Sequence, residues 1–282
     1  MTKASDIRLD KRVAIVTGAG NGIGKCMAQA LVRAGADVVF ADLDVSAAGV
    51  AVAEVAFRPG CGKALAVPCD ITSPRDCERT VNETVRLFGA LHILVNNAGK
   101  GPTHVENAPK TKSMKFWEAD AEAWAKVIET NVVGTFFMSR SAAPHLIGNG
   151  WGRIVNVTTS LSTMQRRENS PYGVSKTAIE AETLIWAQDL EGTGVSCNSL
   201  IPGGAVNTNF LSARGKEDAV RSGRPLLEPD VMIAPILWLG SPHSDAINGR
   251  RYVGKFWKPD MTIEAGVAAA LEAPVLMRPD RA

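Results

Sequence analysis

The chain has 282 residues, 45% of them hydrophobic, which is enough to bury a core and too many for a disordered chain. The 31 basic and 29 acidic residues nearly cancel and form no block of like charge, which argues against a nucleic-acid partner. No apolar run reaches the ~18 residues of a membrane helix. Five cysteines without CxxC spacing fit reduced thiols, and four scattered histidines suggest no metal site. We therefore expect a cytoplasmic protein without a membrane partner.

Short apolar runs alternate with stretches of helical length. Strands are predicted over residues 13–16, 38–41, 64–67, 93–95, 153–157, 195–201 and 251–253. Helices are predicted over residues 22–34, 45–57, 74–88, 118–143, 172–190 and 229–239, with a further short helix over 263–271. Because helices separate the strands, the strands should be parallel and joined by right-handed crossovers. Uninterrupted apolar strands indicate a sheet covered on both faces, which is a doubly wound α/β fold.

Three segments lack this alternation, namely residues 100–117, 202–228 and 255–282. They are rich in proline, glycine or charge and show weak periodicity. No internal repeat or inter-domain linker separates them from the rest. We therefore expect one domain over residues 1–282, with its core at about 10–255 and residues 255–282 as a C-terminal extension.

A glycine-rich loop follows the first strand. Its glycines are Gly18, Gly22 and Gly24, with Ile23 between the last two. Glycines there let the backbone turn tightly and approach a pyrophosphate, whose charge the next helix N-terminus stabilises. A structural turn is the simpler alternative. The position of the loop between a strand and a helix favours phosphate binding.

Asp42 ends the second predicted strand, 18 residues after Gly24. A carboxylate there can accept hydrogen bonds from an adenosine ribose. It would repel a 2′-phosphate, and the neighbouring residues offer no cation, so NAD is favoured over NADP. The alternative is that Asp42 caps the helix over 45–57, a role that Asp44 could equally fill.

With later motifs, this loop resembles the short-chain dehydrogenase/reductase family. The matching residues are Thr17-Gly18-xxx-Gly22-Ile23-Gly24, Asn96-Asn97-Ala98-Gly99, Asn131, Tyr172-Gly173-Val174-Ser175-Lys176 and Pro202-Gly203, over roughly residues 10–255. The resemblance implies a single Rossmann-like domain, a nicotinamide cofactor and hydride transfer at an alcohol or carbonyl carbon. It also implies homodimers or homotetramers, formed through the helices at 118–143 and 172–190.

The resemblance further implies a set of cofactor contacts. These are Gly18, Asn21, Gly22, Ile23, Asp42, Asp70, Ile71, Asn97, Ala98, Gly99, Tyr172, Lys176 and Thr208. Asp70 and Ile71 would meet the adenine, and Asn97 to Gly99 would line the ribose. Thr208 would contact the carboxamide, although it lies one residue later than the family usually has it. Asn96 is expected to tether neighbouring strands instead.

The chemistry is expected to depend on Tyr172 and Lys176. Alcohol oxidation needs a base near the hydroxyl, and free tyrosine, with a pKa of about 10, is a poor base at neutral pH. Lys176 lies four residues later, on the same helix face, where its ammonium favours tyrosinate. A surface Tyr-Lys pair without chemistry is the alternative. The chain has only one other tyrosine, Tyr252.

Two further polar positions complete the expected catalytic set. Asn131 is either a local helix bend or, by resemblance, the holder of a water joined to Lys176. Thr159 stands 13 residues before Tyr172, where the family usually has serine, and Ser160 is the alternative hydroxyl.

The expected function is NAD-dependent oxidation of a secondary alcohol, or reduction of its ketone, on a small or mid-sized molecule. The alternatives are an NADP-linked carbonyl reductase and a catalytically silent NAD-sensing regulator. Residues 100–117 are expected to form a pocket wall and the tail a subunit contact. Apolar candidates for the pocket, each of which could equally belong to the core, are Phe116, Trp117, Met164, Phe210 and Leu211.

Overall fold

The computed structural model describes residues 2–55, 57–101, 115–221, 223 and 225–276. Its strands form one sheet in the order β3-β2-β1-β4-β5-β6-β7-β8, parallel except for β8. The strands are β1 (Val13–Thr17), β2 (Asp37–Asp42), β3 (Ala64–Pro68), β4 (Ile93–Asn96), β5 (Gly152–Val157), β6 (Val195–Ile201), β7 (Arg251–Val253) and β8 (Leu271–Glu272). The predicted doubly wound α/β fold is confirmed.

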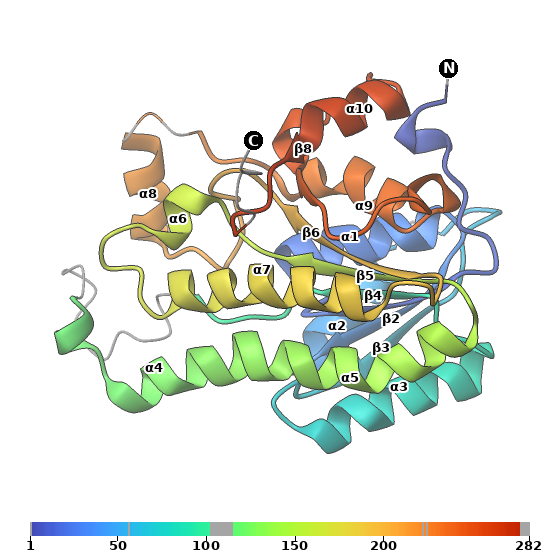
Figure 1. The fold of residues 1–282 in the computed structure, drawn as a ribbon, viewed down its shortest axis with the longest axis horizontal. Helices are drawn as coiled ribbons and strands as arrows, with labels where there is room; N and C mark the ends of the chain where they lie inside the picture. Colours follow the sequence, from blue (N-terminus) through green and yellow to red (C-terminus); the bar gives the residue numbers. More distant parts are fainter. Residues whose placement is uncertain (1, 56, 102–114, 222, 224, 277–282) are drawn as a thin grey trace.

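Helices cover both faces of this sheet (Figure 1). The α-helices are α1 (Gly22–Arg33), α2 (Val45–Ala53), α3 (Pro74–Phe88), α4 (Ala121–Ile128), α5 (Gly134–Gly148), α6 (Leu161–Met164), α7 (Tyr172–Asp189), α8 (Ala213–Arg221), α9 (Ile233–Leu239) and α10 (Ile263–Ala270). Single turns are η1 (Ala4–Asp6), η3 (Phe116–Glu118), η5 (Pro229–Met232), η6 (Pro242–Ser244) and η7 (Gly254–Phe256), and η4 (Glu129–Val133) is a π-helix. Helices α1, α2 and α9 share one face, and α3, α5 and α7 the other.

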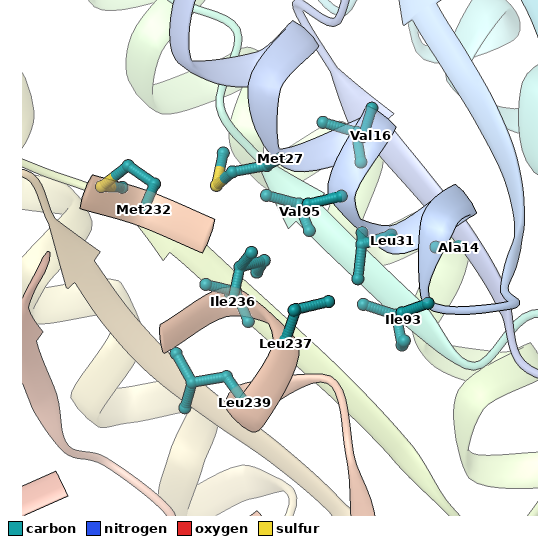
Figure 2. Close-up of a cluster of buried hydrophobic side chains, with 14 of the residues drawn as sticks. Ala14, Val16, Met27, Leu31, Ile93, Val95, Met232, Ile236, Leu237 and Leu239 are labelled. Carbon is teal, nitrogen blue, oxygen red and sulfur yellow. The ribbon is translucent and has the colours of Figure 1, made fainter. Parts of the chain in front are cut away.

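Helices α1 and α9, far apart in the sequence, pack together over β1 and β4 (Figure 2). Side chains in this layer include Ala14, Val16, Met27, Leu31, Ile93, Val95, Met232, Ile236, Leu237 and Leu239. The intervening strand residues Ile15 and Leu94 point to the opposite face and join the second core. Alternate residues of one strand therefore enter two cores, which explains why the strands are apolar throughout.

The long helical stretch predicted over residues 118–143 is present, with a π-helical segment inside it. The Asp120 side chain accepts from the Ala123 N–H at 2.7 Å and starts α4 there, and the helical path continues without a break through η4 into α5. Helix α2 ends at Ala53, short of the predicted end, because the chain turns and buries Val55 in the core. Among the described residues, no helix is both long and apolar enough to span a bilayer.

Two segments without a clear pattern contain regular structure. Helix α8 lies within residues 202–228; it is strongly charged and buries few apolar groups, which explains its weak periodicity. In the tail, α10 buries Ile263 and Ala270 in the main core, and β8 extends the sheet beside β7. The expected pocket wall at 100–117 falls mostly on residues 102–114, outside the described residues.

Candidate active site

The glycine loop after β1 has a backbone path that excludes larger residues. Gly18 and Gly22 have φ of 63° and 56°, in the left-handed region that favours glycine. A Cβ on Gly24 would lie 2.1 Å from the Gly18 carbonyl oxygen. Asn21 is the N-cap of α1, and its side chain makes no capping hydrogen bond. The loop thus has the close-packed shape of a pyrophosphate cradle opening onto a helix N-terminus.

Asp42, at the carboxyl end of β2, closes this loop from the side. Its carboxylate accepts the Gly20 N–H at 2.8 Å and the Asp44 N–H at 3.0 Å. The cap of α2 is Asp44, whose side chain accepts the Ala47 N–H at 3.0 Å. Asp42 is therefore not the helix cap, and its negative charge lies beside the glycine loop.

Asp70 and Ile71 follow β3 and have local partners. The Asp70 carboxylate accepts the Thr72 N–H at 2.9 Å and the Thr72 hydroxyl at 2.7 Å, which forms a tight turn. Ile71 is 6% exposed and packs against Gly134 at the start of α5. The geometry shows a turn and a core contact, and the adenine contacts of this pair stay a prediction.

The segment from Asn96 to Gly99 ties the centre of the sheet together. Asn96 donates to Asn156 Oδ1 at 2.8 Å, which confirms its predicted role as a tether between β4 and β5. Asn97 is a second tether, since its Nδ2 donates to the carbonyls of Thr17 and Gly18 at 3.0 and 3.1 Å. These bonds hold the glycine loop against the end of β4.

The loop after β6 crosses from the glycine loop to Tyr172. A Cβ on Gly22 would lie 3.0 Å from the Thr208 methyl, so Thr208 faces the start of α1. Two residues on, the Phe210 ring lies 5.6 Å from the Tyr172 ring, measured between centroids. A Cβ on Gly101 would lie 2.7 Å from the same Phe210 ring. Phe210 therefore provides an apolar surface beside Tyr172.

The other apolar candidates do not meet Tyr172 in this way. Phe116 and Trp117 are exposed and pair with each other edge to face at 5.1 Å between ring centroids. Met164 is buried, and its backbone lies against Gly173. Trp117 and Met164 thus show surface and core roles, while Phe116 also lines a pocket together with Trp124 and Ser170.

Tyr172 begins α7 and contacts Thr159, which lies just beyond β5. Burial raises the pKa of Tyr172 to about 12, while a side-chain hydrogen bond with Thr159 and the positive charge of Arg166 act to lower that pKa. Ser160 is used differently: its hydroxyl caps α6 at the Thr163 N–H and bonds the hydroxyl groups of Ser162 and Thr163. The geometry therefore pairs Tyr172 with Thr159 and leaves Ser160 in a capping position.

Lys176 lies one turn further along α7 and is 6% exposed. Its Nζ donates to the Val157 carbonyl at 2.8 Å, at the end of β5. Burial lowers the pKa of Lys176 to about 8, and the Glu180 carboxylate acts in the opposite direction. The spacing of four residues thus brings a buried amine close to Tyr172, as predicted from the helical repeat.

Asn131 lies in the π-helical segment, a distortion that occurs frequently at functional sites. Its Oδ1 accepts the Lys100 N–H at 2.7 Å, and its Nδ2 donates to the Lys100 carbonyl at 3.0 Å and to Ser175 Oγ at 2.9 Å. A Cβ on Gly99 would lie 3.0 Å from Asn131 Oδ1 and 3.8 Å from Lys176 Nζ. Asn131 therefore fixes the chain after β4 beside Lys176, with both amide hydrogens and one acceptor site of Oδ1 in use.

This geometry combines a glycine loop, a carboxylate at the end of β2 and a Thr-Tyr-Lys set, all at the carboxyl ends of the parallel strands. The short chain dehydrogenase family model matches residues 12–219. The chain belongs to the short-chain dehydrogenase/reductase family.

Individual members of the family are similar over most of the chain. The 7alpha-hydroxysteroid dehydrogenase of Escherichia coli (strain K12) is 34% identical over 76% of this chain and 78% of the relative. The 3-ketoacyl-(acyl-carrier-protein) reductase of Brucella melitensis, solved with NADH, is 30% identical with a TM-score of 0.73 over 86% of this chain and 96% of that chain. A structure from Beutenbergia cavernae with NADP at low occupancy is 27% identical. Its TM-score is 0.74, and the match covers 88% of this chain and 96% of that chain.

Within this short-chain dehydrogenase, the sequence analysis missed two buried charged residues next to the Thr-Tyr-Lys set. Glu180 extends the four-residue series of Tyr172 and Lys176, a signal that could have found it. Arg251, on β7, had no such signal, because it is the second of two arginines after a polar Asn-Gly pair and only begins the predicted strand over 251–253. Only the sheet order brings β7 next to β6 and close to the end of β5.

Proposed function

We propose that this short-chain dehydrogenase transfers a hydride between NAD and a secondary alcohol or ketone, with Tyr172 as the general base and acid. The observation that carries the proposal is that Tyr172 has the Thr159 side chain within its electrostatic reach and the buried amine of Lys176 one helical turn further along α7. An alcohol oxygen placed between the two hydroxyl groups would lie within reach of a base and a donor, as proton transfer requires. Phe210 would flank the carbon skeleton of the substrate.

The glycine loop fits the shape expected of a dinucleotide loop, since its path requires glycine: a Cβ on Gly18 would meet the Ala98 backbone, and one on Gly24 would meet the Gly18 carbonyl oxygen. Gly18, Asn21, Gly22 and Ile23 would hold its pyrophosphate at the N-terminus of α1. Asn97, Ala98 and Gly99 would line the nicotinamide ribose, and Thr208 would meet the carboxamide. Asp70 and Ile71 would border the adenine.

Asp42 supports NAD over NADP. Its carboxylate is anchored by two backbone N–H groups and lies beside the loop. An anchored negative charge can accept ribose hydroxyl groups and repels a 2′-phosphate. The relatives themselves include an NADH and an NADP complex, so this assignment depends on Asp42 of this chain.

The chain's own residues would control one proton. A phenol with a pKa of about 12 stays protonated at neutral pH, so charge must be added before it can act as a base. When bound, oxidised nicotinamide accepts the hydride and brings a positive charge. Lys176, kept cationic by the Glu180 carboxylate, adds a second one. The Thr159 hydroxyl would donate to the substrate oxygen. Asn131 would hold the chain beside Lys176 in place, where the proton would leave for solvent.

We also propose that the protein forms homodimers or homotetramers through α5 and α7. Exposed apolar side chains on these helices support this proposal, including Phe136, Val174 and Ile185, which are 42%, 53% and 54% exposed. Such groups are costly to leave in water and mark interaction surfaces when they cluster. Sedimentation velocity measures the state directly, and a monomer at micromolar concentration would contradict the proposal.

The decisive experiment is turnover of an alcohol panel with NAD and with NADP at alkaline pH. We expect oxidation with NAD that Tyr172→Phe reduces by about 10³-fold or more, because the general base is removed. The matched control is Tyr252→Phe, which alters the other tyrosine in the core and should leave turnover unchanged. Tight NAD binding without turnover on a broad panel would contradict the enzyme and support a sensor. Preferential turnover with NADP would contradict the cofactor assignment.

A further inference from the structure

A buried chain of charged groups connects the C-terminal tail to Thr159. Arg251 on β7 is 1% exposed and forms an ion pair with Glu180 of α7, which is equally buried. Its Nη2 donates to the Thr159 carbonyl oxygen at 2.9 Å. Its Nε donates to Glu272 Oε2 at 2.7 Å, and Glu272 faces Arg251 across the antiparallel pair of β7 and β8. One guanidinium thus contacts three separate elements or their ends, namely α7, the chain just beyond β5, and β8.

Two of these elements carry the proposed chemistry. Glu180 is one turn beyond Lys176 on α7, and Thr159 is the hydroxyl that meets Tyr172. Thr158 joins both sides, because its hydroxyl bonds Glu180 and accepts from Arg251 Nη1 at 3.4 Å. Arg251 therefore fixes the distance between the end of β5 and the helix that supplies Tyr172. The planar guanidinium suits this task, since its donors have fixed directions.

Stability alone does not account for this arrangement. A buried ion pair gains little over apolar residues of similar size, because both charges lose their hydration. The bond from Arg251 to the Thr159 carbonyl restricts the position of the Thr159 hydroxyl. Small displacements of reacting groups lower the reaction rate strongly. The donor aimed at the Thr159 carbonyl is the contact that a purely structural ion pair would not need.

We propose that Arg251 is a positioning residue that holds Thr159 against Tyr172, with Glu180 as its anchor and Glu272 as the counterion supplied by the C-terminal tail. The inference rests on the proposed function, in which Thr159 acts through its hydroxyl. It gives residues 271–272 of the tail a role in the geometry of the reaction.

The test compares Arg251→Lys with Arg153→Lys. Lysine at 251 keeps a positive charge for Glu180 but cannot serve Thr159 and Glu272 as well. We expect kcat to fall about 10- to 100-fold, with the KM for NAD unchanged. The pH profile of alcohol oxidation should move to higher pH, since Tyr172 loses a hydrogen bond that lowers its pKa. Arg166 and Lys176 are untouched in this variant.

Arg153→Lys is the matched control, because Arg153 is also buried on a strand, pairs with Asp245 and lies at the opposite end of β5. It should lower the melting temperature without moving the pH profile. In a Thr159→Val background, Arg251→Lys should have little further effect on kcat, since its route of action is gone. A drop in melting temperature alone, or additive losses in the double variant, would overturn the proposal.

A readout without turnover separates this proposal from the proposed function. The two tyrosines permit ring-carbon NMR of labelled protein, with Tyr252→Phe assigning the Tyr172 signal. Arg251→Lys should shift that signal in the same direction as Thr159→Val, and Arg153→Lys should not shift it. If the shift is present and no alcohol is turned over, the proposed function fails and the positioning role stands. If turnover depends on Tyr172 and the shift is absent, the positioning role fails alone.

Discussion

Strand β5 has a buried arginine network at each end, and the two networks differ in what their partners touch. At the amino end, Arg153 pairs with Asp245, which is 58% exposed, and its guanidinium lies 4.1 Å from the Trp151 ring centroid. Arg12 lies over the same ring at 3.7 Å. Arg153 itself is buried, and its partner Asp245 is the member of the pair that reaches solvent.

At the carboxyl end, Arg251 binds Glu180 and the Thr159 carbonyl, and through them it reaches the groups around Tyr172. The two arginines are alike in burial and charge, so neither property marks a functional residue by itself. The two networks differ in their partners. Of the two, the Arg251 network is the one that binds the residue whose hydroxyl could meet a substrate, Thr159. Variants at the amino end should therefore affect stability, and variants at the carboxyl end should affect rate.

The largest expected effect is on stability at the amino end. Arg153→Met should lower the free energy of unfolding by about 1–3 kcal/mol, because the Gly152 carbonyl loses the hydrogen bond that Arg153 donates to it, whereas the exposed Asp245 regains water. Urea denaturation measures this loss. Activity per folded molecule should stay at the wild-type value, and a large fall in kcat without loss of stability would break the comparison.

At the carboxyl end, Thr159→Val should lower kcat about 10- to 100-fold with the fold intact, because a hydrogen bond to a charged reacting oxygen contributes about 1.5–3 kcal/mol. Ser160→Ala is the neighbouring control, since that hydroxyl caps α6. Steady-state kinetics of both variants decide between them. A greater loss of kcat in Ser160→Ala than in Thr159→Val would reverse the assignment.

A smaller effect is expected at Asp42, which lies at the carboxyl end of β2. Asp42→Ala should reduce the preference for NAD over NADP by about tenfold, because the charge that repels a 2′-phosphate is removed. Asp44→Ala should instead cost about 1 kcal/mol of stability through loss of the α2 cap. Titration of both cofactors measures the preference. An unchanged ratio in Asp42→Ala would show that Asp42 does not contact the ribose.

The smallest effect concerns an acid of α7 outside both arginine networks. Glu182, two residues after Glu180, has one buried oxygen without a hydrogen-bond partner among the described residues, and burial raises its pKa from 4.5 to about 7. A raised folded-state pKa means that this group stabilises the fold below about pH 4.5 and that the contribution is lost as the pH rises through about 7.

Glu182→Gln should therefore be more stable than the wild type by about 1 kcal/mol near pH 8 and similar to it near pH 5. Urea denaturation at the two pH values provides the measurement. Equal stability of the two proteins near pH 8 would show that Glu182 has a partner in solution, such as a second subunit.

Local patterns in the sequence were sufficient for the sheet and for the central pair of the site. Apolar runs separated by helices dictate parallel strands covered on both faces, and the i, i+4 spacing of Tyr172 and Lys176 follows from one turn of helix. Two local features were not predicted. The start of α4 is set by the Asp120 cap, and the π-helix at Asn131 depends on contacts with Lys100 and Ser175, which lie far from it in the sequence.

The sequence by itself therefore determined the doubly wound fold, the glycine loop and the Tyr-Lys pair, because each depends on backbone geometry within a few residues. The tertiary structure decided the rest. Thr159 rather than Ser160 is the proposed partner of Tyr172 because the Ser160 hydroxyl caps α6, and Phe210 lies beside Tyr172 because the loop after β6 crosses there. Arg251 binds Thr159 from two strands away, and only the order of β5, β6 and β7 makes that contact.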